Sequence, residues 1–210
     1  MQTHCLRVEE RPRSDNYQAG KAGLRATARV AIGLLVCGTL LFAPSRASAQ
    51  SDDGSEYQVK LAFLYNFAQF VQWPPEAFSS PTAPLMLCVA GPDPFKGEIE
   101  QGLRGRTANG HRIQILRLKP EDDPRACHVI FVRASEEKAA RKILAVLKGS
   151  NTLTVGESTG FAARGGIINL TLDENKLRFE INLGSAMQTE LKISSRLLAL
   201  AKIVKVEQKP

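Results

Sequence analysis

Apolar residues follow two different periods along the chain, and the segments that show each period alternate with one another. Apolar residues that recur every three or four positions predict helices at residues 56–73, 95–103, 136–148 and 185–206. Shorter apolar or alternating runs predict strands at residues 85–90, 112–118, 128–132 and 151–155, and a β-hairpin formed by residues 166–172 and 176–183. Helices that alternate with apolar strands are typical of α/β proteins. The sequence therefore predicts a mixed, largely parallel sheet covered by helices, with long N-terminal and C-terminal helices and a C-terminal β-hairpin.

The first predicted helix carries two apolar stripes and ends before Pro74 and Pro75. The first stripe holds Tyr57, Leu61, Leu64, Ala68 and Val71, and the second holds Val59, Phe63, Phe67 and Phe70. One apolar stripe is enough to pack a helix on a core, so two stripes would bury it on most sides. The pattern fits a central core helix, and it also fits a helix whose second stripe packs against another chain.

A separate apolar run of 14 residues, 30–43, precedes these elements. A membrane-spanning helix needs about 20 apolar residues, whereas the apolar region of a signal peptide needs only about 7–15. Arg25 and Arg29 precede the run, and Ala47 and Ala49 follow it as the two small residues of a cleavage site. We therefore expect residues 1–49 to be a signal peptide, and residues 50–210 to form a single exported domain.

The predicted signal peptide carries more than half of the net charge of the chain. The formal charge is +7, from 28 Lys and Arg and 21 Asp and Glu, and residues 1–49 hold seven of the basic and three of the acidic residues. Residues 50–210 therefore have a net charge of +3. This balance does not indicate a nucleic-acid-binding protein, which needs clustered contacts to phosphate groups.

Two cysteines, Cys88 and Cys127, remain after residue 49. Two cysteines in an exported protein suggest one disulfide, and both lie at predicted strands that could be neighbours. Two buried thiols are the alternative. A metal site is not expected, because His111 and His128 are the only histidines after residue 49 and lack ligand-like spacing to the cysteines.

One motif suggests catalysis, but its surroundings do not. Residues 156–160 read Gly-Glu-Ser-Thr-Gly and match the nucleophile elbow of hydrolases, with Ser158 in the nucleophile position. In that fold the histidine base follows the serine, and no histidine follows His128. The chain also lacks glycine-rich phosphate and dinucleotide motifs. We therefore expect no enzyme activity and no cofactor, with a serine hydrolase kept as a competing hypothesis.

Five stretches of the chain resemble, in order, sequences of the YfiR family of periplasmic regulators. They are YQVKLAFLYNFAQFVQWP (57–74), LCVAGPDPF (87–95), CHVIFV (127–132), LTVGESTGFAARGGIINL (153–170) and LRFEINLGSAMQTELKISSRLLALAKIV (177–204). The resemblance covers nearly all of residues 50–210. No one of these stretches is specific alone, and their succession carries the assignment.

The resemblance implies a non-enzymatic regulatory domain that works in the periplasm. Such a protein binds the periplasmic sensor domain of an inner-membrane diguanylate cyclase and represses it, which lowers cyclic-di-GMP output and biofilm formation. Cys88 and Cys127 match one cysteine pair of the family, while residues 150–170 contain no counterpart of a second pair. The alternative is a periplasmic small-molecule-binding module that serves another membrane sensor.

A regulator of this kind needs apolar or aromatic anchors for its partner. The candidate anchors are Phe63, Tyr65, Phe67 and Phe70 in the first helix, and Phe161 and Arg164 in the loop that contains residues 160–164. The basic side of the last predicted helix is a further candidate surface. The two stripes of the first helix would also allow a homodimer.

Overall fold

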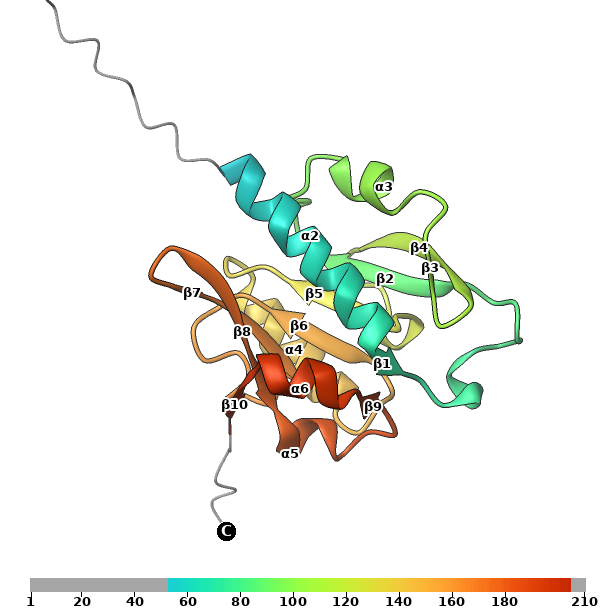
Figure 1. The fold of residues 1–210 in the computed structure, drawn as a ribbon. Coiled ribbons are helices and arrows are strands. Elements are labelled where there is room, and N and C mark those ends of the chain that lie inside the picture. The colour runs from blue at the N-terminus through green and yellow to red at the C-terminus, as the bar shows by residue number, and fades with distance from the viewer. Residues whose placement is uncertain (1–52, 205–210) are drawn as a thin grey trace, which may run out of the picture. The chain divides into compact units, whose positions relative to one another are not determined.

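The computed structural model describes residues 53–204, which form one eight-stranded sheet, one two-stranded sheet and the helices around them (Figure 1). The helices are α2 (Asp53–Phe70), α3 (Glu98–Leu103), α4 (Glu137–Leu147), α5 (Leu183–Ala186) and α6 (Ser195–Leu200), with short 3-10 helices η1 (Pro75–Ala77) and η2 (Pro124–Ala126). The strands are β1 (Val71–Gln72), β2 (Leu85–Ala90), β3 (Thr107–Ala108), β4 (His111–Leu118), β5 (Val129–Val132), β6 (Leu153–Gly156), β7 (Ile168–Asp173), β8 (Lys176–Asn182), β9 (Lys192–Ile193) and β10 (Lys202–Val204).

The large sheet is mostly parallel, as the sequence predicts. Its strand order is β10-β8-β7-β6-β5-β2-β4-β3, and only the β7–β8 and β3–β4 pairs are antiparallel. The antiparallel β7–β8 pair is the predicted hairpin, and its turn uses positive φ angles at Glu174 (48°) and Asn175 (59°). Two left-handed residues are the conformation that a tight hairpin turn requires. The mixed α/β fold is thus confirmed.

The sheet separates two hydrophobic clusters. The larger cluster lies under α2, with contributions from α3 and α6, and the smaller one lies under α4. In Figure 1, α2 crosses the sheet on the near side and α4 lies behind it. We call the side with α2 the first face of the sheet and the side with α4 the second face.

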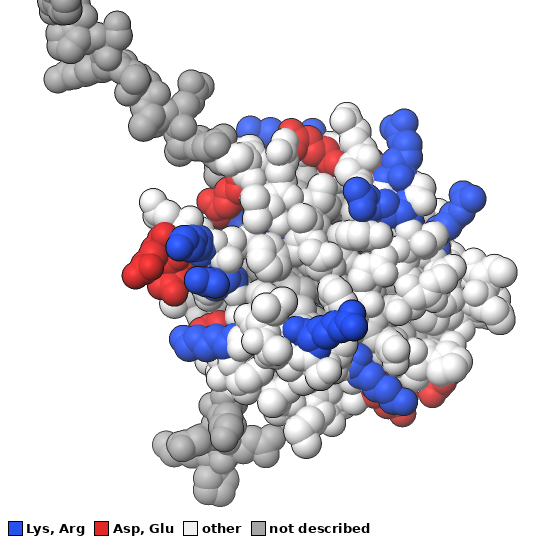
Figure 2. Space-filling view, in the orientation of Figure 1, with Lys and Arg blue, Asp and Glu red and all other residues white. Residues whose placement is uncertain are grey.

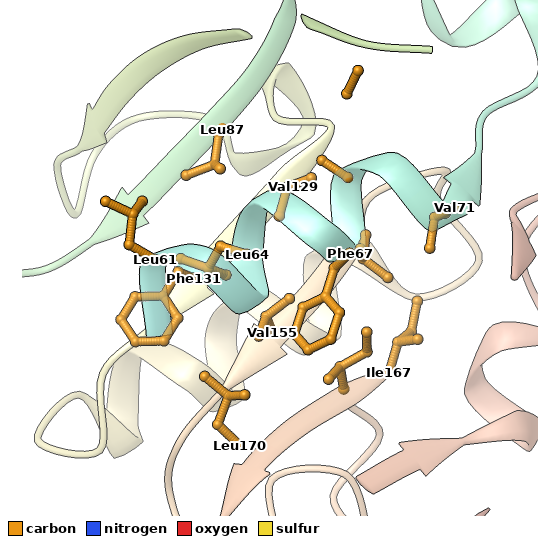
Figure 3. Packing of buried hydrophobic residues seen from close by; sticks show 14 of the residues in the cluster. Leu61, Leu64, Phe67, Val71, Leu87, Val129, Phe131, Val155, Ile167 and Leu170 are labelled. Carbon is orange, nitrogen blue, oxygen red and sulfur yellow. The ribbon is translucent and has the colours of Figure 1, made fainter. Parts of the chain in front are cut away.

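The first stripe of α2 packs on the sheet, while much of the second stripe does not. Every residue of the first stripe is buried, and Leu64, Ala68 and Val71 are completely so. Figure 3 shows Leu61, Leu64 and Phe67 of α2, and Val71 at the start of β1, pointing toward apolar side chains of the large sheet. Of the second stripe, Phe67 is also buried, Phe63 is half-buried, and Val59 and Phe70 are exposed. The helix therefore has one side in the core and one side at the surface.

The predicted long helix at residues 185–206 is wrong. The chain instead forms two short helices separated by β9, and then adds β10 to the edge of the large sheet in parallel with β8. β9 pairs with β1, and the Ser194 N–H donates to the Phe70 carbonyl at the end of α2. The Ser194 side chain then accepts from the Leu197 N–H and so begins α6 as an N-cap. These long-range hydrogen bonds override a modest local preference for helix.

The predicted disulfide between Cys88 and Cys127 is present. Cys88 lies in β2, and Cys127 lies just before β5, the strand that pairs with β2. Both residues are buried in the cluster under α4. The bridge therefore joins two neighbouring strands at the centre of the sheet.

A segment of residues 74–83, here called the strap, is held by a stack of three aromatic rings. Phe78 lies between His111 and His128, with ring centroids 3.6 and 4.4 Å away and both pairs nearly parallel. The His111 ring also contacts the Ala83 carbonyl through Nδ1 at 2.6 Å, and His128 contacts the Ala77 carbonyl through Nε2 at 3.0 Å. The two histidines thus fix both halves of the strap.

The hydrogen bonds of His128 suit only its neutral form. Nδ1 accepts from the Met86 N–H at 3.0 Å, so the ring proton lies on Nε2 and is donated to Ala77. Burial lowers the pKa of His128 and the nearby His111 lowers it further, while the Ala77 carbonyl opposes the shift. Glu76 and Arg125 are the charged residues that line the hollow beside it. Protonation would place a second donor against the Met86 N–H and weaken the strap.

We expect replacement of Cys88 and Cys127 by alanine to lower the free energy of unfolding by about 4 kcal/mol, because the bridge closes a loop of 39 residues and restricts the unfolded chain. Urea denaturation of the oxidised protein and of the double variant measures the difference. A reducing agent should destabilise the parent and leave the double variant unchanged. Equal sensitivity of the two proteins to reduction would contradict the prediction.

We expect the protein to lose stability as the pH falls below about 6.5, by up to about 1.4 kcal/mol per pH unit from His128 alone. The folded-state pKa of His128 lies below its unfolded value, so the unfolded chain binds more protons in this interval. Chemical denaturation at several pH values tests this, since His128→Asn removes the titrating ring and should give a flatter profile. Parallel profiles for parent and variant would rule out His128 as the cause.

Candidate partner-binding surface

The exposed side of α2 carries large apolar side chains. Val59 is 46% exposed and Phe70 is 36% exposed, at opposite ends of the helix. Between them the half-buried Phe63 packs its ring against Phe67 and Phe179, at centroid distances of 5.8 and 5.7 Å. This side of α2 is therefore continuous with the apolar face of β8.

The β7–β8 hairpin and the C-terminal elements extend this apolar surface. Leu172 is opposite Leu177, and Ile203 is opposite Ile181, so all four side chains lie on the same side of the sheet as Phe179. Leu172 is 60% exposed and Leu200, on the adjoining α6, is 76% exposed. We call the resulting surface the apolar face, and its members are Val59, Phe63, Phe70, Leu172, Leu177, Leu200 and Ile203.

Few charged side chains interrupt this side of the molecule. Figure 2 views the protein from the side of α2 and shows an area over the helix without charged side chains; acidic side chains lie toward its border, while Lys and Arg side chains lie at the border and also below the helix. Soluble monomers rarely expose large contiguous apolar patches without an interaction partner. An apolar centre with a charged rim is also the usual arrangement of a protein–protein interface. The surface thus has the chemical character of a docking site.

The structure places the six predicted anchors in different environments. Phe63 and Phe70 lie in the apolar face, whereas Tyr65 is half-buried and lies under the Arg106 guanidinium, 4.7 Å from its ring centre. Arg164 is exposed on the loop after β6. The sequence analysis missed Leu172, Leu200 and Ile203. The apolar alternation of the hairpin could have indicated Leu172, but no local signal marked the other two.

Phe67 and Phe161 correct the prediction, because both are fully buried and cannot contact a partner in this conformation. Phe67 lies in the core between α2 and the sheet. Phe161 packs against two glycines of the same loop region, Gly156 and Gly166, where a Cβ atom would lie 2.4 and 2.2 Å from its ring. Phe161 therefore acts as the internal anchor of its loop.

A buried ionic cluster fixes the N-terminal half of α2 to the carboxyl end of β6. Lys60 Nζ lies 2.6 Å from Glu157 Oε2 and 2.5 Å from Glu56 Oε1, and the side chains of Lys60 and Glu157 are each only 7% exposed. Glu157 Oε1 accepts hydrogen bonds from the Tyr57 hydroxyl at 3.0 Å and from the Ala134 N–H at 3.2 Å. The five groups thus satisfy one another.

The protonation states of this cluster are those of a structural site. Burial alone would lower the pKa of Lys60, but its hydrogen bonds to Glu157 and Glu56 outweigh burial and raise the pKa above its usual value. Burial raises the pKa of Tyr57, and the charge of Glu157 raises it further. Lys60 therefore stays an ammonium and Tyr57 stays a phenol at neutral pH. Neither is suited to act as a base.

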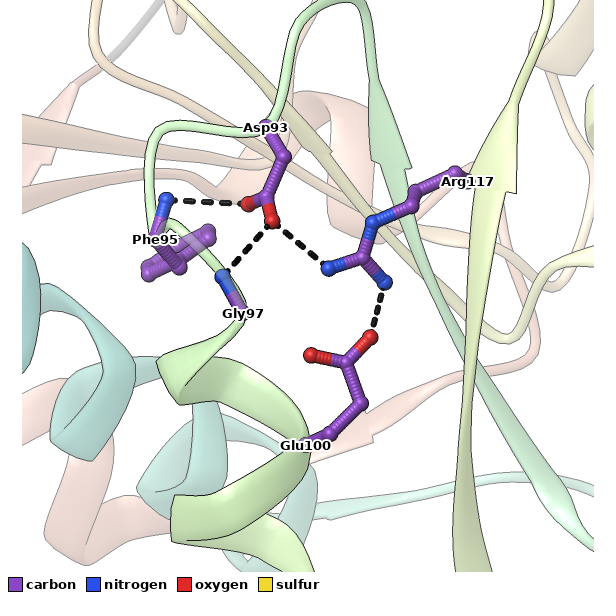
Figure 4. Close-up of polar contacts among 5 residues, drawn as sticks. All are labelled: Asp93, Phe95, Gly97, Glu100 and Arg117. Atoms are coloured by element: carbon purple, nitrogen blue, oxygen red, sulfur yellow. Dashed lines mark hydrogen bonds and ion pairs between the residues drawn. The ribbon is translucent and has the colours of Figure 1, made fainter.

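A second polar cluster fixes the loop after β2 to α3 and β4 (Figure 4). Arg117 contacts Asp93 at 2.6 Å and also pairs with Glu100. Asp93 further accepts hydrogen bonds from the backbone N–H groups of Phe95 and Gly97. Burial by itself would raise the pKa of Asp93, but these hydrogen bonds and Arg117 outweigh it, so the pKa is lowered. The carboxylate is thus committed to holding the loop.

The described residues offer no support for hydrolysis by Ser158. Its hydroxyl accepts a hydrogen bond from Arg164 at 2.8 Å. The rings of His111 and His128 contact carbonyl groups of the strap instead, those of Ala83 and Ala77. Within residues 53–204 no group of three His, Cys, Asp or Glu side chains could hold a metal ion, and no helix is long and apolar enough to cross a membrane.

Residues 57–202 match the YfiR/HmsC-like family, DUF4154. The chain belongs to this family. The family is associated with the regulation of diguanylate cyclases and acts with membrane-associated regulators; its domain is regulatory rather than catalytic. Among solved structures, a conserved domain protein of Vibrio cholerae is similar at 17% identity and a TM-score of 0.42. The match covers 59% of this chain and about half (55%) of that protein.

We expect Glu157→Gln to lower the free energy of unfolding by about 3 kcal/mol, because it leaves the Lys60 ammonium buried with one carboxylate removed. Arg125→Ala is the matched control, since the Arg125–Asp123 pair is exposed and should contribute less than about 0.5 kcal/mol. Urea denaturation compares the two variants. Similar losses in both would show that the buried cluster does not anchor α2.

Proposed function

We propose that this protein is a periplasmic, non-enzymatic regulator that binds the periplasmic sensor domain of an inner-membrane diguanylate cyclase and represses it. The apolar face is the observation that carries the proposal, because it is an exposed surface of the kind that binds other proteins. Membership of the YfiR/HmsC-like family supports the type of partner. The predicted signal peptide, residues 1–49, lies outside the described residues, and the disulfide is consistent with an oxidising compartment.

Repression of this kind needs a rigid surface rather than a reactive group. A regulator shifts its partner to an inactive conformation only by the difference between its affinities for the two conformations. The apolar face can provide such a difference because α2 is fixed along its whole length, by Lys60 near its start and by Phe67 and Val71 near its end. Phe63, Phe70 and Val59 can then contact the partner without reorganisation of the helix.

The alternative function, binding of a small molecule, has less support in the geometry. A hollow at the carboxyl end of β6 is lined by Tyr57, Lys60 and Glu157, and this end of parallel strands is a usual position for ligands. Its charged groups are already paired with one another. A ligand would have to break a buried ion pair to reach them, which favours the protein-binding proposal.

We expect Val59→Glu and Leu172→Asp to raise cellular cyclic-di-GMP to the level of a strain that lacks the gene, because a buried carboxylate would prevent docking of the apolar face. Val146→Glu is the control, since Val146 on α4 is 38% exposed on the opposite side of the sheet. Nucleotide quantification and recovery of a cyclase by pull-down provide the measurements.

Two outcomes would contradict different parts of this proposal. An unchanged cyclic-di-GMP level after deletion of the gene would exclude the cyclase as the regulated enzyme. Full repression by folded Val59→Glu and Leu172→Asp variants would exclude the apolar face as the docking site. Sedimentation of the parent and the same variants tests the predicted homodimer separately.

A further inference from the structure

The second face of the sheet lacks a helix where the fold would normally place one. β5 and β6 are parallel neighbours joined through α4, which lies on the second face. β6 and β7 are also parallel neighbours, but residues 157–167 join them without a helix. Parallel strands are usually connected by a crossover helix that covers the sheet. The position beside α4 is therefore not filled by this connection.

The connection between β6 and β7 stays close to the sheet because Phe161 anchors it. Phe161 is fully buried and packs against Gly156 and Gly166. Both glycines lie so close to its ring that neither position has space for a Cβ atom. The Gly166 N–H also donates to the Phe161 carbonyl. This tight loop leaves a groove of about 460 Å³ between itself, α4 and α5.

Basic and small residues line the groove, and none of its lining residues is acidic. Arg141 and Lys148 lie on the α4 side, and Arg164 lies on the loop side. Small residues border the remaining space: Ala145, Gly149, Ala163, Gly165, Gly184 and Ser185. The groove thus combines positive charge with walls that allow a backbone to approach closely.

The positive charge of the groove is largely uncompensated. Lys148 makes no ion pair with another described residue, and Arg164 donates only to uncharged oxygens, the Thr159 carbonyl and the Ser158 hydroxyl. Arg141 pairs with Glu137 at 3.4 Å, an exposed contact within α4 that contributes little. An anionic partner would therefore meet three cations at little cost in broken interactions.

We propose that this groove binds an acidic helix of another protein, which would occupy the missing helix position beside α4. The charge selects an acidic segment, and the gap in the helical layer selects a helix of about the length of α4, roughly 16 Å. The groove and the apolar face lie on opposite sides of the sheet, so both can be occupied at once. This inference does not depend on the cyclase as a partner.

A labelled helical peptide of alanine and glutamate, about 11 residues long to match α4, is the probe for this site. Fluorescence anisotropy with protein purified from the periplasm should show binding that weakens at high salt, and no binding of an alanine–glutamine peptide of equal length. Arg141→Gln with Lys148→Gln should lower the affinity roughly tenfold. Arg104→Gln with Arg112→Gln removes the same charge from exposed positions outside the groove and should leave binding unchanged.

A variant that fills the groove tests its shape independently of its charge. Gln188 is exposed and lines the groove, so Gln188→Trp should block the glutamate peptide while the melting temperature stays near that of the parent. Equal loss of binding in both double-neutralised variants would show a non-specific charge effect and overturn the proposal. Absence of binding at millimolar peptide would also overturn the proposal. So would the finding that the parent protein is a dimer and that Gln188→Trp makes it a monomer, because a second copy of the chain would then fill the groove.

Discussion

The packing of one stripe of α2 on the first face of the sheet determines most of this structure. Leu64, Ala68 and Val71 of this stripe are fully buried against strands that come from distant parts of the chain. A leucine or valine side chain contributes about 1.5–3 kcal/mol by leaving water. Because a helix is straight and its stripes lie at fixed angles, burial of the first stripe also decides where the second one points. The exposed side of α2 is thus a consequence of how the core is packed.

The polar clusters at the carboxyl end of the sheet complete this arrangement. Open α/β sheets usually bind their ligands at this end, yet here Glu157 is held by Lys60, and Asp93 by Arg117. Groups that neutralise one another in a partly buried site fix the geometry of loops but retain little capacity for chemistry. The carboxyl end of the sheet, which carries the active site in many α/β proteins, therefore holds α2 and the loop after β2 in place in this protein.

The sequence was sufficient for the parts of the fold that local patterns determine. The two stripes of α2, the alternation of the hairpin and the positions of Cys88 and Cys127 all led to elements that the structure contains. It was insufficient at residues 185–206, where a helical period of apolar residues is interrupted by pairing with β1 and β8. β1 lies more than a hundred residues before β9 in the sequence, so no local pattern reveals this pairing.

The candidate site was harder to predict because exposure depends on packing, which the sequence does not show. Phe63 and Phe67 belong to the same stripe of α2, yet Phe179 and the core strands bury Phe67 fully and leave Phe63 at the edge. Leu200 and Ile203 became surface residues only because the predicted helix is broken and β10 joins the sheet. The broken C-terminal helix leaves Leu200 and Ile203 in the apolar face, and the β6–β7 connection without a helix leaves the basic groove beside α4. We propose that both surfaces bind proteins rather than small substrates.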